Sequence, residues 1–285
     1  MSDNRISEKT IINLSGYRFV QLDELERLQE ELKEGLAAAG VKGAVILAEE
    51  GINVTLAGVR LQTDAAVSCL DAHPALKGLW LKESFSEFVP HKRLRVRIRT
   101  EIIAFDGDES IALQALRPLA PAVSPDTLDS WLDEHRNITL LDTRNDYEIE
   151  SGTFESASHL DIKHFRHFKD AVRQALDAGE LDKAQPLVTF CTGGIRCEKA
   201  APWLLAEGFE QVYQLEGGLI NYLQQTKTSH WQGDCFVFDD RVELTPELEA
   251  TGAGLCDKCQ LAVPEGTDCQ CQLGVHYHAT YQASD

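Results

Sequence analysis

A cysteine, two glycines and an arginine stand close together in the second half of the chain. They form the segment Cys191-Thr192-Gly193-Gly194-Ile195-Arg196, between an apolar run at 187–190 and a helical pattern at 198–206. In a strand–loop–helix element of this kind, glycines let successive backbone N–H groups point inward, and the helix dipole adds positive potential. Both effects favour a thiolate at Cys191, and Arg196 adds a fixed charge whose fork can hold or steer an anion. The sequence predicts that Cys191 is an activated nucleophile or sulfur carrier, assisted by Arg196.

The alternative is that Cys191 is buried as a small apolar residue at a strand end. The glycines and the arginine of the loop favour chemistry over packing. Loop length separates two kinds of chemistry, because Cys191 and Arg196 enclose four residues, fewer than the related phosphatase loops enclose around a larger phosphate. The shorter loop resembles that of rhodaneses, which carry sulfane sulfur as a persulfide on this cysteine. Cys197 follows directly, and it either resolves an oxidised or persulfide state of Cys191 or packs at the start of the helix.

A second segment fits the rhodanese resemblance. Residues 140–148 contain Asp142, Arg144 and Glu148, in an order that resembles the Asp-x-Arg-x-x-x-Glu opening of rhodanese domains. An apolar strand precedes them, and the carboxyl ends of strands in an open parallel sheet form its ligand-binding edge. We expect Asp142 and Glu148 to be structural, pairing with the loop backbone or with Arg196. Arg144 either supports the site in the same way or takes part in the chemistry.

Four stretches together resemble one family, the tRNA uridine-34 hydroxylases. They are EGINVTLAG at 50–58, CTGGIRCEKA at 191–200, YQLEGG at 213–218 and CFVFDDRV at 235–242. The resemblance implies oxygen-dependent hydroxylation of carbon 5 of the wobble uridine, with molecular oxygen as co-substrate and Cys191 essential. It also implies tRNA as the partner, gripped through the anticodon arm.

Three functions stay open when the residues are considered alone. The first is a tRNA-modifying oxygenase that uses Cys191. The second is a rhodanese-type sulfurtransferase that carries a persulfide on the same cysteine. The third is a silent rhodanese module that serves as a binding scaffold, although the intact loop argues against it because silent copies commonly lack the nucleophile.

One basic stretch stands out in an otherwise acidic protein. The formal net charge is −19, so the summed field opposes non-specific binding of polyanions, and a nucleic acid must be met by a local patch. The stretch 91–99 alternates basic and apolar residues, which would put its arginines on one face of a strand. A solvated strand face neutralised by nearby carboxylates is the alternative. The predicted tRNA contacts are Lys92, Arg93, Arg95, Arg97 and Arg99, with Lys199 added from the helix after the cysteine loop.

The C-terminal tail is rich in cysteine and poor in periodic apolar residues. Cys256 and Cys259 have the two-residue gap of metal ligands, and Cys269 and Cys271 follow with a one-residue gap. A structural zinc ion on these four thiolates would give the tail a reason to fold. The one-residue gap departs from the usual spacing, and so the sequence leaves zinc binding open.

The elements expected around these sites define the fold class. Residues 11–98 follow the order strand, helix, strand, strand, helix, strand of a ferredoxin-like, or acylphosphatase-like, unit, with the last strand at 94–98. Strands at 138–141, 187–190 and 212–215 alternate with helical patterns, which predicts a doubly wound parallel sheet. We therefore predict α/β and α+β architecture with three parts. They are a ferredoxin-like domain at 1–115, a rhodanese domain at 120–228 and a Cys-rich C-terminal extension at 229–285.

Composition narrows the cellular setting and the cofactors. The first residues are mostly polar or charged, and no apolar run approaches the ~18 residues of a membrane span, so we expect a cytoplasmic protein without a membrane partner. There is no Gly-x-Gly-x-x-Gly fingerprint and no histidine–carboxylate set arranged as an iron site, so no organic cofactor is predicted. The sequence leaves the oligomeric state, the tRNA isoacceptors and the means of oxygen activation open.

Overall fold

The computed structural model describes residues 10–105, 120–226, 230–269 and 271 of the chain. The chain divides into two compact units, one ending at Ile102 and the other beginning at Ile103, and each is described by itself. Among the described residues, none of the helices has the length and apolar character required to cross a membrane.

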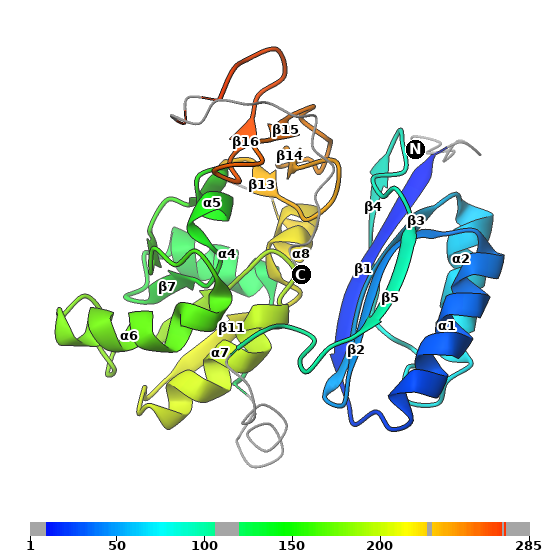
Figure 1. Ribbon diagram of the computed structural model, residues 1–285. Helices are drawn as coiled ribbons and strands as arrows, with labels where there is room; N and C mark the ends of the chain where they lie inside the picture. Colours follow the sequence, from blue (N-terminus) through cyan, green and yellow to red (C-terminus); the bar gives the residue numbers. More distant parts are fainter. Residues whose placement is uncertain (1–9, 106–119, 227–229, 270, 272–285) are drawn as a thin grey trace. The chain divides into compact units, whose positions relative to one another are not determined.

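The first unit is a five-stranded sheet with two helices on one face (Figure 1). Its elements are β1 (Ile11–Phe19), α1 (Leu25–Ala39), β2 (Lys42–Ala48), β3 (Gly51–Gly58), α2 (Arg60–Asp71), β4 (Lys82–Ser86) and β5 (Leu94–Ile98). The strand order is β4-β1-β3-β2-β5, with β2 and β3 joined as an antiparallel hairpin and β5 parallel to β2.

The position of the last strand differs from the prediction. The strand beside β1, where the final strand of a ferredoxin-like unit belongs, is β4, and the segment predicted for that role forms β5 at the opposite edge of the sheet. The sequence of β4, KESFS, has one apolar residue, and the strand pairs with β1 alone. An edge strand of this length carries little hydrophobic periodicity, which explains why the pattern missed it.

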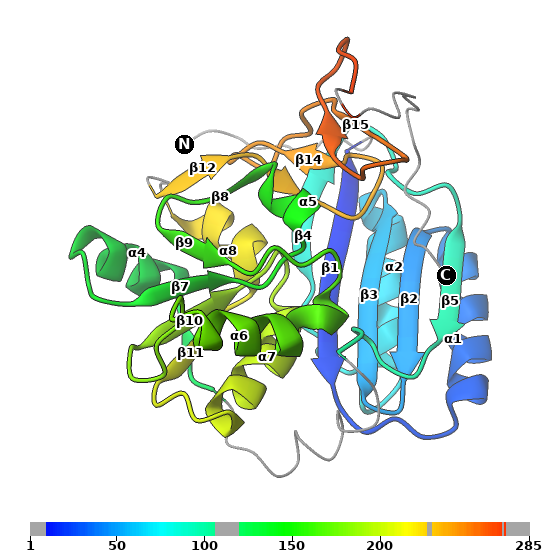
Figure 2. The same cartoon turned by 60° about the vertical axis from the view of Figure 1, so that its left-hand side comes forward.

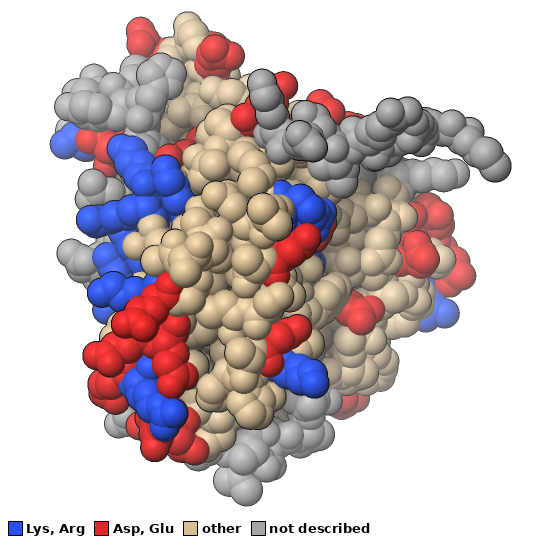
Figure 3. All heavy atoms as spheres, turned by 90° about the vertical axis from the view of Figure 1, so that its right-hand side faces the viewer, with Lys and Arg blue, Asp and Glu red and all other residues tan. Residues whose placement is uncertain are grey.

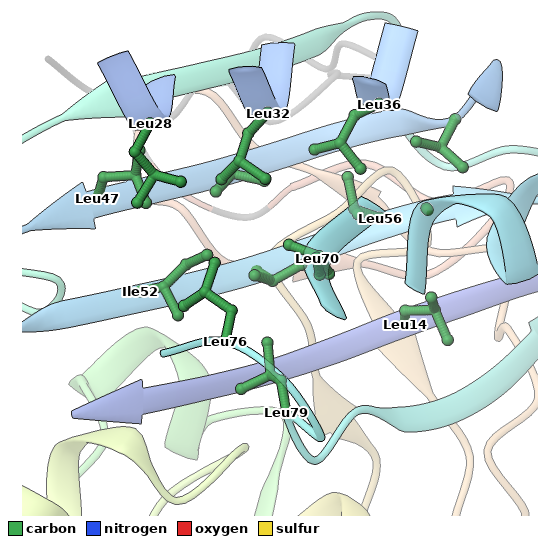
Figure 4. Packing of buried hydrophobic residues seen from close by; sticks show 14 of the residues in the cluster. Leu14, Leu28, Leu32, Leu36, Leu47, Ile52, Leu56, Leu70, Leu76 and Leu79 are labelled. Atoms are coloured by element: carbon green, nitrogen blue, oxygen red, sulfur yellow. The ribbon is translucent and has the colours of Figure 1, made fainter. Parts of the chain in front are cut away.

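Leucines spaced three and four residues apart join α1 to the sheet. Leu28, Leu32 and Leu36 are buried, and they pack against inward-facing residues of the strands (Figure 4). The strands supply these residues at every second position, such as Ile52 and Leu56 of β3, because successive side chains point to opposite faces. The helix ends at Gly40, which adopts a left-handed φ of 78° as its C-cap.

The second unit contains the predicted parallel sheet. Its elements up to residue 225 are β6 (Ala122–Val123), α4 (Pro125–Asp133), β7 (Thr139–Asp142), α5 (Asp146–Ile149), β8 (Gly152–Phe154), β9 (Ala157–His159), the 3-10 helix η1 (Phe165–His167), α6 (Phe168–Asp177), β10 (Leu187–Phe190), α7 (Ile195–Ala206), β11 (Val212–Leu215) and α8 (Gly218–Gln225). The strand order is β6-β11-β10-β7-β9, and every neighbouring pair is parallel (Figure 2). The predicted α/β and α+β fold class is therefore confirmed.

Two hydrophobic clusters cover the two faces of this sheet. One packs residues of α6 and α7, such as Phe168 and Leu204, against Leu187. The other packs residues of α4 and α8, such as Leu128 and Tyr222, against Phe190. Helices on both faces leave the carboxyl ends of β7 and β10 as the edge at which the predicted site residues lie.

Residues after α8 continue the same unit. Their strands are β12 (Trp231–Gly233), β13 (Cys235–Phe236), β14 (Glu243–Leu244), β15 (Gly254–Leu255) and β16 (Ala262–Val263). β12 pairs with β8, and Trp231, Val237 and Leu244 lie in the hydrophobic cluster of Phe190. The first part of the tail thus shares a core with the parallel sheet, whereas the predicted domain boundaries at 115, 120 and 228 remain predictions.

Candidate active site

Cys191 lies at the carboxyl end of the central strand β10. The loop after it ends at Gly194, which has a left-handed φ of 97° and is the N-cap of α7. This backbone conformation turns the N–H of Gly194 back toward the loop, where it donates a hydrogen bond to the Cys191 Sγ at 3.1 Å. The Cys191 side chain is fully buried, with 0% of its surface exposed.

The surroundings of Cys191 stabilise a thiolate despite this burial. Burial has the largest effect on the pKa and raises it, because a charge is poorly solvated in the interior. The hydrogen bond from Cys197, the positive charge of Arg196 and the backbone N–H groups of Arg196 and Gly194 act in the opposite direction. Together they lower the pKa of Cys191 to about 5, and so the group is ionised at neutral pH.

Arg196 and Glu148 form a bidentate pair beneath the loop. The two terminal nitrogens of Arg196 donate to the two carboxylate oxygens of Glu148, both at 2.6 Å, and the side chains are 6% and 0% exposed. Glu148 also accepts hydrogen bonds from the hydroxyl of Thr192 and the backbone N–H of Asn145. The Glu148–Arg196 pairing expected from the sequence is present.

This pairing changes what Arg196 can do. The sequence suggested that its guanidinium fork could bind an external oxyanion, but in the structure Glu148 occupies the fork. Arg196 therefore acts on Cys191 through its positive charge and its backbone N–H, and its side chain fixes the loop to α5.

Asp142 and Arg144 form a second buried pair next to the first. Both side chains are 0% exposed, and Arg144 Nη2 donates to an oxygen of Asp142 at 2.6 Å. Arg144 also donates to the carbonyl of Gly152 at 2.6 Å, and its guanidinium lies over the rings of Phe190 and Trp231. Since every contact of Arg144 is internal to the fold, its position favours the supporting role over chemistry.

The N-terminus of α8 holds the cysteine loop from the other side. The backbone N–H of Leu219 donates to the carbonyl of Cys191 at 2.9 Å, and that of Ile220 donates to the carbonyl of Thr192 at 3.1 Å. Gly218 has a φ of 68°, and a Cβ there would lie 2.5 Å from the Cys191 carbonyl oxygen. Gly218 is therefore required for α8 to approach the loop this closely.

Phe238 is a neighbour of the site that the sequence patterns did not reveal. Its ring lies 5.8 Å from the Arg196 guanidinium carbon, and it packs edge-on against Phe236, which contacts Tyr147 in turn. Phe238 belongs to the stretch 235–242 that carries part of the family resemblance. Nothing in its local pattern indicated a contact with a residue 42 positions earlier in the chain.

Cys197 lies beside Cys191 in the first turn of α7. It is 1% exposed, and the Thr143 hydroxyl lies 3.8 Å from its Sγ while donating to the carbonyl of Phe190 at 2.9 Å. Burial raises the pKa of Cys197 well above its ordinary value, and the adjacent Cys191 raises it further. The two neighbouring thiols therefore differ in protonation at neutral pH.

The predicted basic surface belongs to the first unit. Leu94, Val96 and Ile98 of β5 pack against the hydrophobic core, so the alternating Arg95 and Arg97 point to the opposite face of the sheet. Lys92, Arg93 and Arg99 flank the strand and are exposed. Figure 3 shows Lys and Arg side chains gathered along the left edge of the viewed face, where β5 runs, above a group of Asp and Glu.

Lys199 is not part of this surface, which corrects the prediction for that residue. It is 5% exposed, and its ammonium group donates to the carbonyl of Ile103 at 2.9 Å. The long side chain lies inside the second unit, where it ties α7 to the segment at Ile103. A basic residue on a helix is not always a surface residue, and its local pattern does not distinguish the two cases.

The four cysteines of the tail converge. The sulfur atoms of Cys256, Cys259, Cys269 and Cys271 all lie within 4.8 Å of one another. The distance is 3.7 Å between Cys256 and Cys271 and 3.5 Å between Cys259 and Cys269. Four thiolates at about 2.3 Å around a tetrahedral zinc ion would be about 3.8 Å apart, so these residues fit a metal ion. The one-residue gap between Cys269 and Cys271 does not prevent this arrangement.

Comparisons with known proteins agree with the fold. The UPF0176 acylphosphatase-like domain matches residues 11–102, and the rhodanese-like domain matches residues 124–225. A tRNA uridine(34) hydroxylase from Cupriavidus taiwanensis is 45% identical over 261 residues, covering 89% of each chain. One from Bordetella petrii is 44% identical over 248 residues, covering 85% of this chain and 96% of that protein. A solved rhodanese-like domain from Anabaena covers 40% of this chain and 80% of its own, with 23% identity and a TM-score of 0.33.

An acylphosphatase-like domain followed by a rhodanese-like domain with a complete cysteine loop defines the class of protein. Within that class, the chain belongs to the tRNA uridine(34) hydroxylase family. The resemblance noted in the sequence is thereby confirmed.

Proposed function

We propose that this protein hydroxylates carbon 5 of uridine 34 in tRNA, with molecular oxygen as co-substrate and Cys191 as the essential residue. Membership of the tRNA uridine(34) hydroxylase family supports the reaction. The role of Cys191 is supported by its position and its ionisation. It is buried at the end of a parallel strand, and its pKa is lowered to about 5. A structural cysteine in an apolar interior would have a raised pKa instead.

The residues around Cys191 have distinct proposed roles. Arg196 supplies the positive charge that stabilises the thiolate, and Glu148 orients Arg196 and neutralises part of its charge. The loop residues Thr192, Gly193, Gly194 and Ile195 shape the backbone around the sulfur. Asp142 and Arg144 keep the end of β7 rigid beneath the loop.

We further propose that the basic strand of the first unit binds the anticodon arm. Lys92, Arg93 and Arg99 are exposed, and Arg95 and Arg97 share one face of β5. Arginine forks match phosphate geometry, and a local patch of this kind is what a protein of net charge −19 needs in order to approach RNA. Lys199 is excluded because its ammonium group is buried.

Zinc is proposed as a structural ion of the tail. Cys256 and Cys259 lie on the β15–β16 hairpin, and Cys269 and Cys271 come from the segment after it. All four positions of a tetrahedral ion would be filled by thiolates, which leaves no open position for a substrate. The ion would stabilise a segment that has few apolar residues of its own.

Nucleoside mass spectrometry tests the proposed reaction. tRNA from a host that lacks modified wobble uridine is analysed after expression of the wild-type protein, of Cys191→Ser and of Cys69→Ser, which removes a cysteine of α2 in the other unit. We expect 5-hydroxyuridine with the wild type and Cys69→Ser, and none with Cys191→Ser. Absence of the nucleoside throughout, together with transfer of sulfur from thiosulfate to cyanide, would establish a sulfurtransferase instead.

A further inference from the structure

Two thiols lie side by side in the proposed active site. Hydroxylation by dioxygen requires two electrons from a reductant, and a pair of thiols can supply them. We propose that Cys191 and Cys197 form a dithiol that supplies two electrons to the reaction and is converted to a disulfide in each turnover. This inference rests on the proposed hydroxylase function and goes beyond it, because it assigns the reductant.

The local geometry brings the two sulfur atoms to the same place. The N–H of Gly194 donates to the Cys191 Sγ at 3.1 Å, and the carbonyl of Gly194 accepts from the backbone N–H of Cys197 at 3.1 Å. Gly194 therefore contacts both cysteines through its backbone, and the Cys197 thiol donates a hydrogen bond to the Cys191 sulfur. The Thr143 hydroxyl also contacts Cys197, 3.8 Å from its Sγ.

The two thiols have the complementary states that disulfide formation requires. Cys191 is the thiolate, which can attack or donate electrons, and Cys197 keeps its proton because burial raises its pKa. Both side chains are buried, at 0% and 1% exposure. The other described cysteines, apart from the zinc-type cluster, are Cys69 and Cys235, and neither is in hydrogen-bonding contact with the pair.

The proposed stoichiometry balances. Dioxygen accepts four electrons, two from the C5–H bond of uridine and two from the dithiol. One oxygen atom forms the new C5–OH group, and the other leaves as water. The C5–H bond, the O–O bond and the S–H bond of Cys197 are broken, and the C–O, S–S and new O–H bonds are formed. Because Cys191 starts as a thiolate, one proton is taken from solvent. Uridine, dioxygen, one thiol, one thiolate and one proton thus give 5-hydroxyuridine, water and one disulfide. A thiol reductant then reopens the disulfide by exchange.

A single-turnover experiment on the full-length protein tests this proposal. The protein is reduced, freed of reductant without oxygen, mixed with unmodified tRNA and then exposed to air. 5-Hydroxyuridine is quantified by nucleoside mass spectrometry, and the Cys191–Cys197 disulfide is quantified by differential alkylation and peptide mass spectrometry. We expect about one nucleoside and one disulfide per protein chain, no disulfide without tRNA, and repeated turnover when dithiothreitol is added.

Variants and controls separate the possible outcomes. Cys197→Ser should give no product without added reductant, whereas Cys69→Ser should match the wild type. Product without the disulfide, or an equal single-turnover yield from Cys197→Ser, would overturn the dithiol proposal and leave the hydroxylase function standing. If the wild type with excess dithiothreitol and oxygen makes no 5-hydroxyuridine, the hydroxylase function fails and the dithiol proposal fails with it.

Discussion

Glu148 and Arg196 face each other so that both nitrogens of the guanidinium fork meet both oxygens of the carboxylate, at 2.6 Å in each case. The pair joins α5 to the first turn of α7, and it is almost fully removed from solvent. Its geometry keeps the positive charge of Arg196 near the Cys191 sulfur, and it pairs with Glu148 the two terminal nitrogens that an arginine at an active site often offers to a substrate.

Replacement of Glu148 tests how much this pair contributes to the free energy of unfolding. Glu148→Gln keeps the shape of the side chain but removes the carboxylate charge that is paired with the buried Arg196. We expect the free energy of unfolding to fall by about 3–5 kcal/mol, the range for breaking a buried ion pair. The matched control is Glu134→Gln, which breaks an exposed pair with Arg136 and should cost about 0–1 kcal/mol in urea unfolding. Equal losses for the two variants would contradict the role assigned to the pair.

The ionisation of Cys191 predicts how stability depends on pH. The pKa of this group is about 5 in the folded protein, against an ordinary value of 9.0. The unfolded chain therefore binds more protons between these two values, so the contribution of Cys191 to stability is complete above pH 9 and is lost as pH falls toward 5. Cys197 stays protonated over this window and adds no slope.

The check is the difference in unfolding free energy between the wild type and Cys191→Ala, measured across the same pH range. We expect this difference to increase with pH. Thiolate absorbance in the ultraviolet, as a difference between the two proteins, should disappear near pH 5. A difference that is flat, or that decreases with pH, would show that Cys191 is a neutral thiol in the folded protein.

Gly218 provides a test of how closely α8 must approach the cysteine loop. Gly218→Ala puts a methyl group 2.5 Å from the Cys191 carbonyl oxygen and in a left-handed conformation, so we expect loss of 5-hydroxyuridine formation together with reduced stability. Gly179→Ala is the control, because Gly179 has a similar φ of 74° but no atom within 4 Å of the added Cβ. It should lose only about 1–2 kcal/mol for the backbone conformation, with activity retained. If Gly179→Ala is as inactive as Gly218→Ala, the clash with the loop is not the cause.

The basic strand predicts a particular response of tRNA binding to salt. Arg93→Gln and Arg99→Gln each remove one exposed positive charge beside β5. Each should weaken binding and reduce the slope of log affinity against log salt concentration by about 0.7–0.9, the value for one released counterion. Filter binding or fluorescence anisotropy over a range of salt concentrations measures this. Arg27→Gln, on the surface of α1, should leave the slope unchanged, and a comparable change there would indicate a general charge effect.

The cysteine cluster predicts bound metal in the purified protein. We expect about one zinc ion per chain by elemental mass spectrometry, and its loss in Cys259→Ser together with increased proteolysis of the tail. Cys69→Ser has the same change of residue type outside the cluster and should retain the zinc. Full metal content in Cys259→Ser would mean that the ion lies elsewhere.

The sequence predicted the features that depend on local patterns. The strands at 187–190 and 212–215 and the strand–loop–helix element around Cys191 all follow from patterns within a few residues, and all are present. Features that depend on contacts between distant segments were missed. Phe238 beside Arg196 and the buried ammonium of Lys199 are of this kind. The edge strand β4 was missed because its pairing with β1, rather than its own composition, makes it a strand.

The pairing of β12 with β8 has a consequence for how this family can be recombined. The rhodanese-like match ends at residue 225, yet Trp231 packs against Phe154 and lies over the guanidinium of Arg144, which belongs to the opening segment of that domain. A rhodanese module that ends at residue 225 would lose the packing of Trp231 against its hydrophobic core. In gene fusions and in laboratory domain shuffling, we therefore expect the rhodanese-like domain to be transferable only together with the segment that follows it, as far as Leu244.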